Sequence, residues 1–89
     1  MELIKHSEYY TFNDTTENGW NITGSVNKEC NGNLNISINV SSELEYIGDF
    51  YYSKPTEGNI NMSHNVSEAN RDMFVTYTDS VIDFVLEQF

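Results

Sequence analysis

The chain of 89 residues is short of the residue types that would assign it to a common functional class. It contains four basic residues, one cysteine and one proline. A single cysteine excludes an internal disulfide, and four basic residues against fourteen acidic ones exclude an extended basic surface for direct nucleic-acid binding. No apolar run approaches the roughly 18 residues that span a membrane. The N-terminus MELIKHSEYYTF has no basic segment followed by an apolar one, so we expect a cytoplasmic protein without a secretory signal.

Residues that carry catalysis or bind metal ions are few and scattered. His6, Cys30 and His64 are too far apart in the sequence to form a zinc pattern. Cys30 follows Glu29, whose carboxylate disfavours the thiolate that a nucleophile needs. The chain also lacks a phosphate-binding glycine loop and a Gly-x-Ser-x-Gly elbow. We therefore expect no enzyme, no catalytic residues, no cofactor and no metal.

Alternating apolar and polar residues, typical of strands with one buried face, dominate the first two thirds of the chain. Three segments alternate cleanly, and a fourth is rich in aromatic residues; the N-terminal residues are expected to be extended as well. In the third alternating segment His64 is in register with the apolar residues, which predicts a partly buried sheet residue. The three alternating segments are residues 20–27, 34–41 and 60–66, the aromatic-rich segment is residues 45–54, and the N-terminal segment is residues 2–12.

Six Asn-x-Ser/Thr patterns, which in a secreted protein would mark glycan acceptors, occur in the chain, and five of them fall in the alternating segments. A strand whose polar face is built from Asn, Ser and Thr creates this pattern at every Asn-apolar-Ser/Thr step. We therefore interpret the pattern as a product of strand structure and expect no glycan on these residues. The asparagines are Asn13, Asn21, Asn35, Asn39, Asn61 and Asn65.

Short turns separate the strand-like segments, including two Asn-Gly pairs, the strongest short hairpin signal. Successive strands joined by short turns pair antiparallel. The predicted fold is therefore one α+β domain, residues 1–89, with an antiparallel β-meander of four or five strands over about residues 2–66. Residues 33–42 carry no charge and have high β-propensity, so we expect them inside the sheet, because an exposed edge of this kind recruits other chains.

The last 23 residues, 67–89, predict a helix over about residues 68–88 that packs across the apolar face of the sheet. Its apolar arc is wider than one sheet contact requires. The excess predicts a second contact, either with the N-terminal segment or with a second copy of the chain. We therefore expect a homodimer through the helix flank that carries Val75, Ile82 and Leu86.

The formal net charge of −10 is the most informative feature for function. Asp79, Asp83 and Glu87 follow one another at i,i+4 on the predicted helix, where like charges repel and where the C-terminal end of the dipole favours cations. Because helix stability does not require this row, we expect it to bind a basic protein, a nuclease or another nucleic-acid-binding protein. A second group of nearby acids, without the pattern of a calcium loop, is expected beside it: Glu43, Glu45 and Asp49.

The predicted function is therefore a small acidic inhibitor that blocks its partner by charge complementarity or nucleic-acid mimicry. An immunity protein for a nuclease toxin and a phage-type blocker of restriction, repair or CRISPR machinery both fit this description. The alternative is a structural or assembly subunit that acts through self-association, with acidity serving solubility. A third interpretation is a carbohydrate- or small-molecule-binding sheet built from the polar face and the tyrosines.

Overall fold

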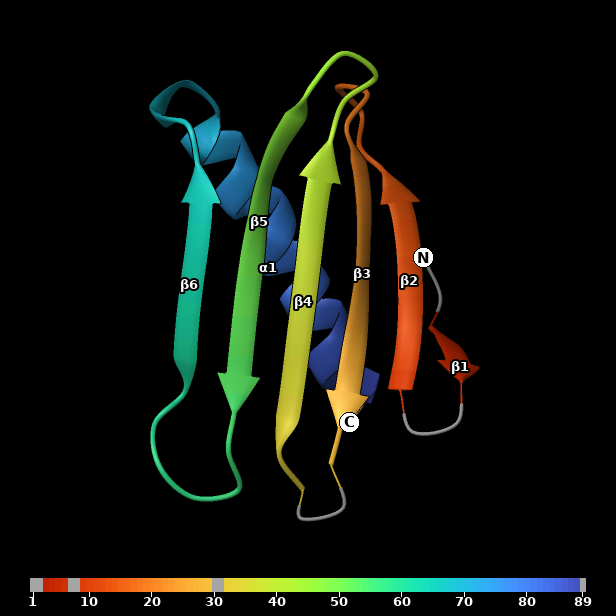
Figure 1. Cartoon of the computed structure of the whole chain (residues 1–89), viewed down its shortest axis with the longest axis vertical. Coiled ribbons are helices and arrows are strands. Elements are labelled where there is room, and N and C mark those ends of the chain that lie inside the picture. Colours follow the sequence, from red (N-terminus) through yellow and green to blue (C-terminus); the bar gives the residue numbers. More distant parts are fainter. Residues whose placement is uncertain (1–2, 7–8, 30–31, 89) are drawn as a thin grey trace.

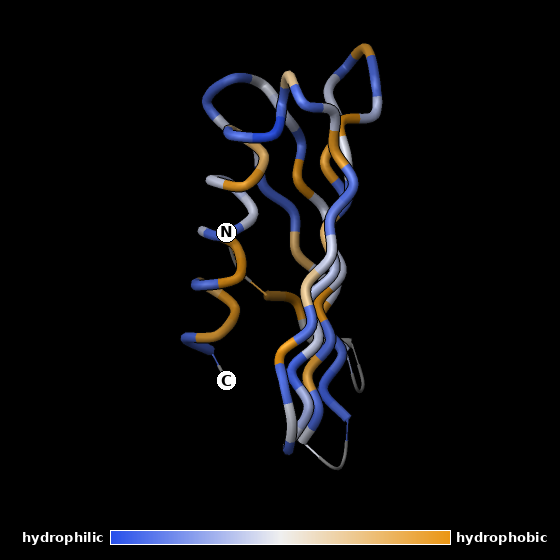
Figure 2. The backbone as a smooth tube through the Cα atoms, turned by 90° about the vertical axis from the view of Figure 1, so that its left-hand side faces the viewer, coloured by the Kyte–Doolittle hydropathy of each residue, from blue (hydrophilic) through white to orange (hydrophobic). Residues whose placement is uncertain are grey.

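The computed structural model describes residues 3–6, 9–29 and 32–88, so Cys30 lies outside the described residues, as does the side chain of His6. A β-sheet forms one layer and a helix the other (Figures 1 and 2). The elements are β1 (Ile4–His6), β2 (Tyr9–Thr15), β3 (Asn21–Lys28), β4 (Leu34–Ser41), β5 (Tyr46–Lys54), β6 (Asn61–Val66), the 3-10 turn η1 (Glu68–Asn70) and α1 (Arg71–Gln88).

The sheet is an antiparallel meander whose spatial order follows the sequence from β1 to β6. The predicted α+β meander with one C-terminal helix is therefore confirmed. Five strands are six residues or longer, and the three-residue β1 adds a sixth. This extra strand arises because the N-terminal segment folds back on itself, pairing Ile4 with Thr11.

Strand β4 lies inside the sheet, as its uncharged sequence predicts. It pairs with β3 on one side and with β5 on the other, and its backbone edges are not open to other chains. Its register with β5 shifts after Val40: Val40 pairs with Gly48, whereas Ser41 pairs with Tyr46. The bulge leaves Ile47 as an extra residue on β5, and both Ile47 and Gly48 are buried.

The core lies between the sheet and α1 (Figure 2). Every second residue of β4 points toward the helix and is buried, while the residues between them face outward. This arrangement follows from the pleat, which sends successive side chains to opposite faces. The buried apolar side chains form one cluster: Phe12, Trp20, Ile22, Val26, Leu34, Ile36, Ile38, Val40, Ile47, Phe50, Tyr52, Phe74, Val81, Ile82 and Val85.

All six asparagines of the Asn-x-Ser/Thr patterns lie in strands. Each of the six asparagines lies on the sheet face that points away from α1, as the cross-strand pairs show. Asn39, for example, pairs with Thr23 and Asp49 on the outward face, whereas its neighbour Val40 is buried under the helix. From β2 to β6 the outward face is therefore built from Asn, Ser, Thr and Tyr, with one formal charge among its described residues, at Asp49.

Strand β6 departs from the expectation. Alternation correctly assigns Met62 and His64 to the helix-facing side, where they pair with Tyr52 and Phe50. The helix does not cover them, however, and Met62 is 63% exposed and Ile60 50% exposed. His64 is also exposed rather than partly buried, with its ring stacked on Phe50 at 6.3 Å between ring centres. The reason is position, because β6 is the last strand of the sheet.

Gly19 and Gly32, the second residues of the two Asn-Gly pairs, lie in tight turns, as predicted. The amide of Gly19 donates to the carbonyl of Thr16 at 3.0 Å, and that of Gly32 donates to Glu29 at 2.9 Å. Both glycines have a positive φ, near 90°, which residues with a Cβ rarely adopt. Within the described part of the chain, no helix is long and apolar enough to cross a membrane.

Candidate functional site

Helix α1 presents its acidic row on the side opposite the core. Five helix residues are buried against the sheet: Phe74, Thr78, Val81, Ile82 and Val85. Asp79, Asp83 and Glu87, here called the helix stripe, are all exposed. They are spaced by about 6 Å along the axis, because a helix rises about 1.5 Å per residue. The predicted row of carboxylates is therefore a continuous surface feature.

The helix is held in this orientation by its buried side. Phe74 and Val85 are fully buried. Thr78 is also fully buried, and its hydroxyl donates to the carbonyl of Phe74 at 2.9 Å, so its polar atom is satisfied inside the helix. The helix therefore cannot rotate the stripe toward the sheet without exposing Phe74 and burying carboxylates, which is strongly unfavourable.

Glu43 and Glu45 lie in the turn between β4 and β5. Ser42 orders this turn, because its hydroxyl accepts hydrogen bonds from the amides of Leu44 and Glu45, at 3.3 and 3.1 Å. The amide of Ser42 in turn donates to the carbonyl of Glu45 at 2.8 Å. Leu44 is 96% exposed between the two acids. Leu44 is not among the predicted contact residues, although it lies between two of them in the sequence.

Asp49 does not lie beside the helix stripe. It belongs to the outward face of β5, so the sheet separates it from α1. Its carboxylate accepts a hydrogen bond of 2.6 Å from the hydroxyl of Tyr46. This hydrogen bond, helped by slight desolvation and by the charge of Asp49, raises the pKa of the Tyr46 phenol above its usual value. The predicted grouping of Asp49 with the stripe is therefore wrong.

We expect the Asp49→Ala variant to ionise Tyr46 at a lower pH than the wild type does. The neutral phenol of Tyr46 donates the hydrogen bond to Asp49. The interaction is therefore present below the pKa of Tyr46 in the folded protein and is lost as the pH rises through that pKa. Nuclear magnetic resonance of ¹³Cζ-labelled tyrosine measures the titration, and Tyr46→Phe assigns the signal. An unchanged titration in Asp49→Ala would show that the hydrogen bond does not form in solution.

A larger acidic surface lies at one end of the sheet. The antiparallel meander brings the β2–β3 turn, the β4–β5 turn and the β6–α1 connection to the same end (Figure 1). The acids in and beside these connections, here called the acidic end, are Asp14, Glu17, Glu43, Glu45, Glu68 and Asp72. Spacing along the sequence does not reveal this group, because its members come from three connections that only the strand order unites.

A shallow pocket of about 260 Å³ lies between the acidic end and α1. Asp14 and Glu17 supply its carboxylates, and Ile22, Tyr77 and Val81 its apolar lining. The ring of Tyr77 packs edge-on against Trp20 at 5.9 Å between ring centres, which holds this flank of the helix against β3. The mixture of acidic and apolar lining suits a side chain with an apolar stem and a cationic head.

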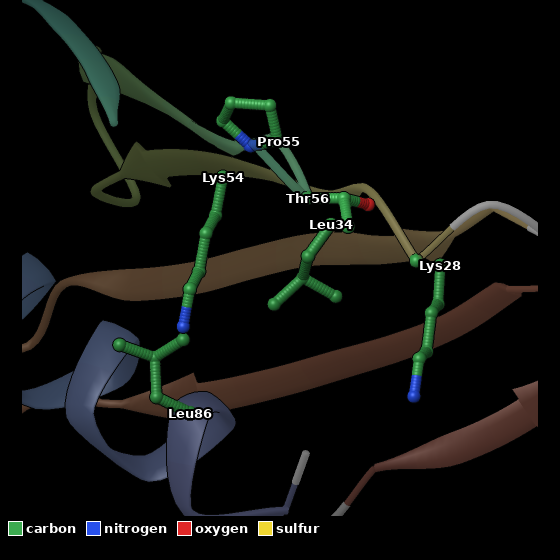
Figure 3. Close-up of a pocket in the computed structure, with 7 residues that line it drawn as sticks. Lys28, Leu34, Lys54, Pro55, Thr56 and Leu86 are labelled. Carbon is green, nitrogen blue, oxygen red and sulfur yellow. The ribbon is translucent and has the colours of Figure 1, made fainter. Parts of the chain in front are cut away.

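A second pocket, of about 310 Å³, lies at the opposite end of the sheet (Figure 3). Lys28 and Lys54 flank Leu34 in one cross-strand row, and Figure 3 shows Lys54 extending toward Leu86 of α1. The last turn of α1 contains no basic residue of its own. Cations near a helix C-terminus are favoured by the dipole, and Lys54 lies beside this end of α1.

The helix flank that was expected to mediate self-association is more buried than the prediction requires. Ile82 is only 6% exposed and belongs to the core between helix and sheet. Val75 and Leu86 are half-buried, and Leu86 packs against the same core. The wide apolar arc of the helix is therefore largely used within one chain. Ile82 is not available to a second copy.

No group of three or more His, Cys, Asp or Glu residues among those described is arranged to hold a metal ion. No protein-family model, curated protein or solved structure matches the chain. The assignment of function therefore depends on the surfaces described above.

Proposed function

We propose that this protein is a non-enzymatic inhibitor that binds a basic, nucleic-acid-binding protein through the helix stripe. The single observation that carries the proposal is the exposure of Asp79, Asp83 and Glu87 on the outward side of α1 without a neighbouring cation on the helix. The partner would meet carboxylates at intervals comparable with the charges of a nucleic-acid backbone. The inhibitor would occupy the site that nucleic acid otherwise fills.

Energetics supports binding rather than folding as the reason for this row. Each i,i+4 pair of like charges is unfavourable by about 0.2–0.5 kcal/mol. The last turn of a helix also favours cations, and α1 has none there. Folding therefore gains nothing from Asp83 and Glu87, whereas a basic partner would relieve their mutual repulsion.

The neighbouring surfaces extend the proposed contact. The pocket lined by Asp14, Glu17 and Tyr77 borders the stripe along the helix flank at Ser80, and it suits a lysine or arginine of the partner. Glu43 and Glu45 add negative charge at the acidic end, where it would attract the same partner over a longer range. Asp49 is left out of the contact, because it is on the other face of the sheet.

The test begins with an affinity-tagged protein recovered from its native source together with its partner. The variant Asp79→Asn/Asp83→Asn is then compared with the wild type in stopped-flow association at several salt concentrations. We expect association with the partner to slow by about tenfold at low salt and to depend less on salt, because charge steering is screened within about 10 Å at 0.1 M. The melting temperature should be equal or slightly higher, since repulsion is relieved.

The matched control is Glu29→Gln/Glu57→Gln, which removes two negative charges from the β3–β4 and β5–β6 connections, outside both the helix stripe and the acidic end. Asn33 and Asn35 donate to different carboxylate oxygens of Glu29, so the single amide oxygen of the glutamine introduced at position 29 can keep one of these two exposed hydrogen bonds. This control should associate at nearly the wild-type rate. An acidic partner would contradict the proposal. Equal effects of the two double variants would also contradict it, because the stripe would then contribute only net charge.

A further inference from the structure

Strand β6 forms an open edge of the sheet (Figure 1). It pairs with β5 on one side, and among the described residues no strand pairs with its other side. Asn61 to Asn65 are all exposed. The backbone N–H and C=O groups on the free side of such a strand can pair with another strand.

This edge lacks the features that usually prevent pairing between chains. Such features are a very short strand, a charged residue, a proline or a bulge. The opposite edge, β1, has three residues and includes Lys5. By contrast, β6 has six residues in one register with β5, and residues 59–66 carry no formal charge at pH 7. Two apolar residues are exposed here: Ile60, which directly precedes β6, and Met62 on the helix-facing side.

We propose that β6 pairs antiparallel with β6 of a second copy about a two-fold axis at Ser63. In a continuous sheet, directly opposed residues lie on the same face. Since successive residues of a strand face opposite sides, the two-fold axis must pass through a residue of β6 and not between two residues. An axis at Ser63 sets Ile60 against Val66 of the second copy and Met62 against His64. An axis at His64 would instead oppose two imidazoles and bring Ile60 to Glu68, so we favour Ser63.

The charge distribution restricts where a second copy can bind. Two chains of net charge −10 repel each other, and the repulsion is least where the surfaces that meet are uncharged. The antiparallel arrangement also brings Ile60 of one copy to the end of β6 in the other, beside the start of α1. The dimer extends beyond the proposed function, because it uses the edge of the sheet and leaves the helix stripe open.

A contact made by one short strand is smaller than a standard protein interface, so we expect dissociation in the micromolar range or above. Analytical ultracentrifugation over a wide concentration range measures it. Ser63→Glu and Ser63→Lys should each raise the dissociation constant at least tenfold, because each places two like charges opposite each other at the axis. An equal mixture of the two variants should dimerise again, since opposite charges then meet.

The control is Ser37→Glu, which adds the same charge in the same cross-strand row of the outward face but on the interior strand β4. This variant should dimerise as the wild type does, and circular dichroism should show that all variants fold. A wild type that is monomeric at millimolar concentration would overturn the proposal. So would a dimer that Ser63→Glu leaves intact, or a mixture of the two Ser63 variants that stays monomeric.

Discussion

Replacing Phe74 with alanine is expected to lower the free energy of unfolding by about 3–5 kcal/mol. Phe74 is fully buried and is the largest of the fully buried side chains. Its ring meets the sheet where β5 has no side chain, with Cε2 3.1 Å from the position that a Cβ on Gly48 would occupy. The ring of His64 covers it from β6, at 6.3 Å between ring centres. Alanine would leave a cavity at the junction of helix and sheet.

Urea unfolding measures this loss, with the fluorescence of Trp20 as the reporter because it is buried and is the only tryptophan. A domain of this size has a total stability near the lower end of about 5–15 kcal/mol, so Phe74→Ala should be partly unfolded at 25 °C. Phe84→Ala is the matched control: Phe84 is half-buried and should cost clearly less. Equal losses for the two variants would contradict the described docking of α1.

Replacing Gly24 with alanine is expected to destabilise the protein by about 1–3 kcal/mol or more. In an ordinary strand the same change is favourable, since glycine has the larger conformational entropy to lose. Here a Cβ would lie 2.5 Å from Cζ of Phe12, whose ring lies over Gly24, and would collide with the carbonyl oxygen of Ser37. Backbone in the middle of the sheet cannot move aside without breaking the ladder between β3 and β4.

Two further variants separate steric conflict from backbone strain in this prediction. Gly19→Ala meets no atom within 4 Å but requires a positive φ, near 90°, so it should cost only about 1 kcal/mol. Phe12→Leu combined with Gly24→Ala should cost less than the sum of the two single changes, because the smaller side chain relieves part of the clash. Gly24→Ala with wild-type stability in urea would show that the ring of Phe12 does not occupy this place.

The sequence by itself determined the local structure of this protein. Alternation at period two assigned the faces of β3, β4 and β6, since the pleat sends successive side chains to opposite faces. Asn-Gly pairs located two turns, and the absence of charge in residues 33–42 located β4 inside the sheet. The exposed helix stripe was also predictable, because residues four apart on a helix lie on one side. These features depend on neighbours within a few residues.

Only the tertiary structure decided which faces are covered. An α1 of 18 residues is about 27 Å long and about 10 Å wide, whereas six strands spaced by about 4.8 Å span about 24 Å. One helix cannot cover such a sheet, so Met62 and His64 on β6 remain exposed although their pattern matches that of buried strands. The same packing buries Ile82, which the sequence assigned to the surface. The packing of α1 on one face of the sheet separates Asp49, on the other face, from the helix stripe. The strand order brings the three connections of the acidic end together, because proximity across a sheet depends on which strands pair.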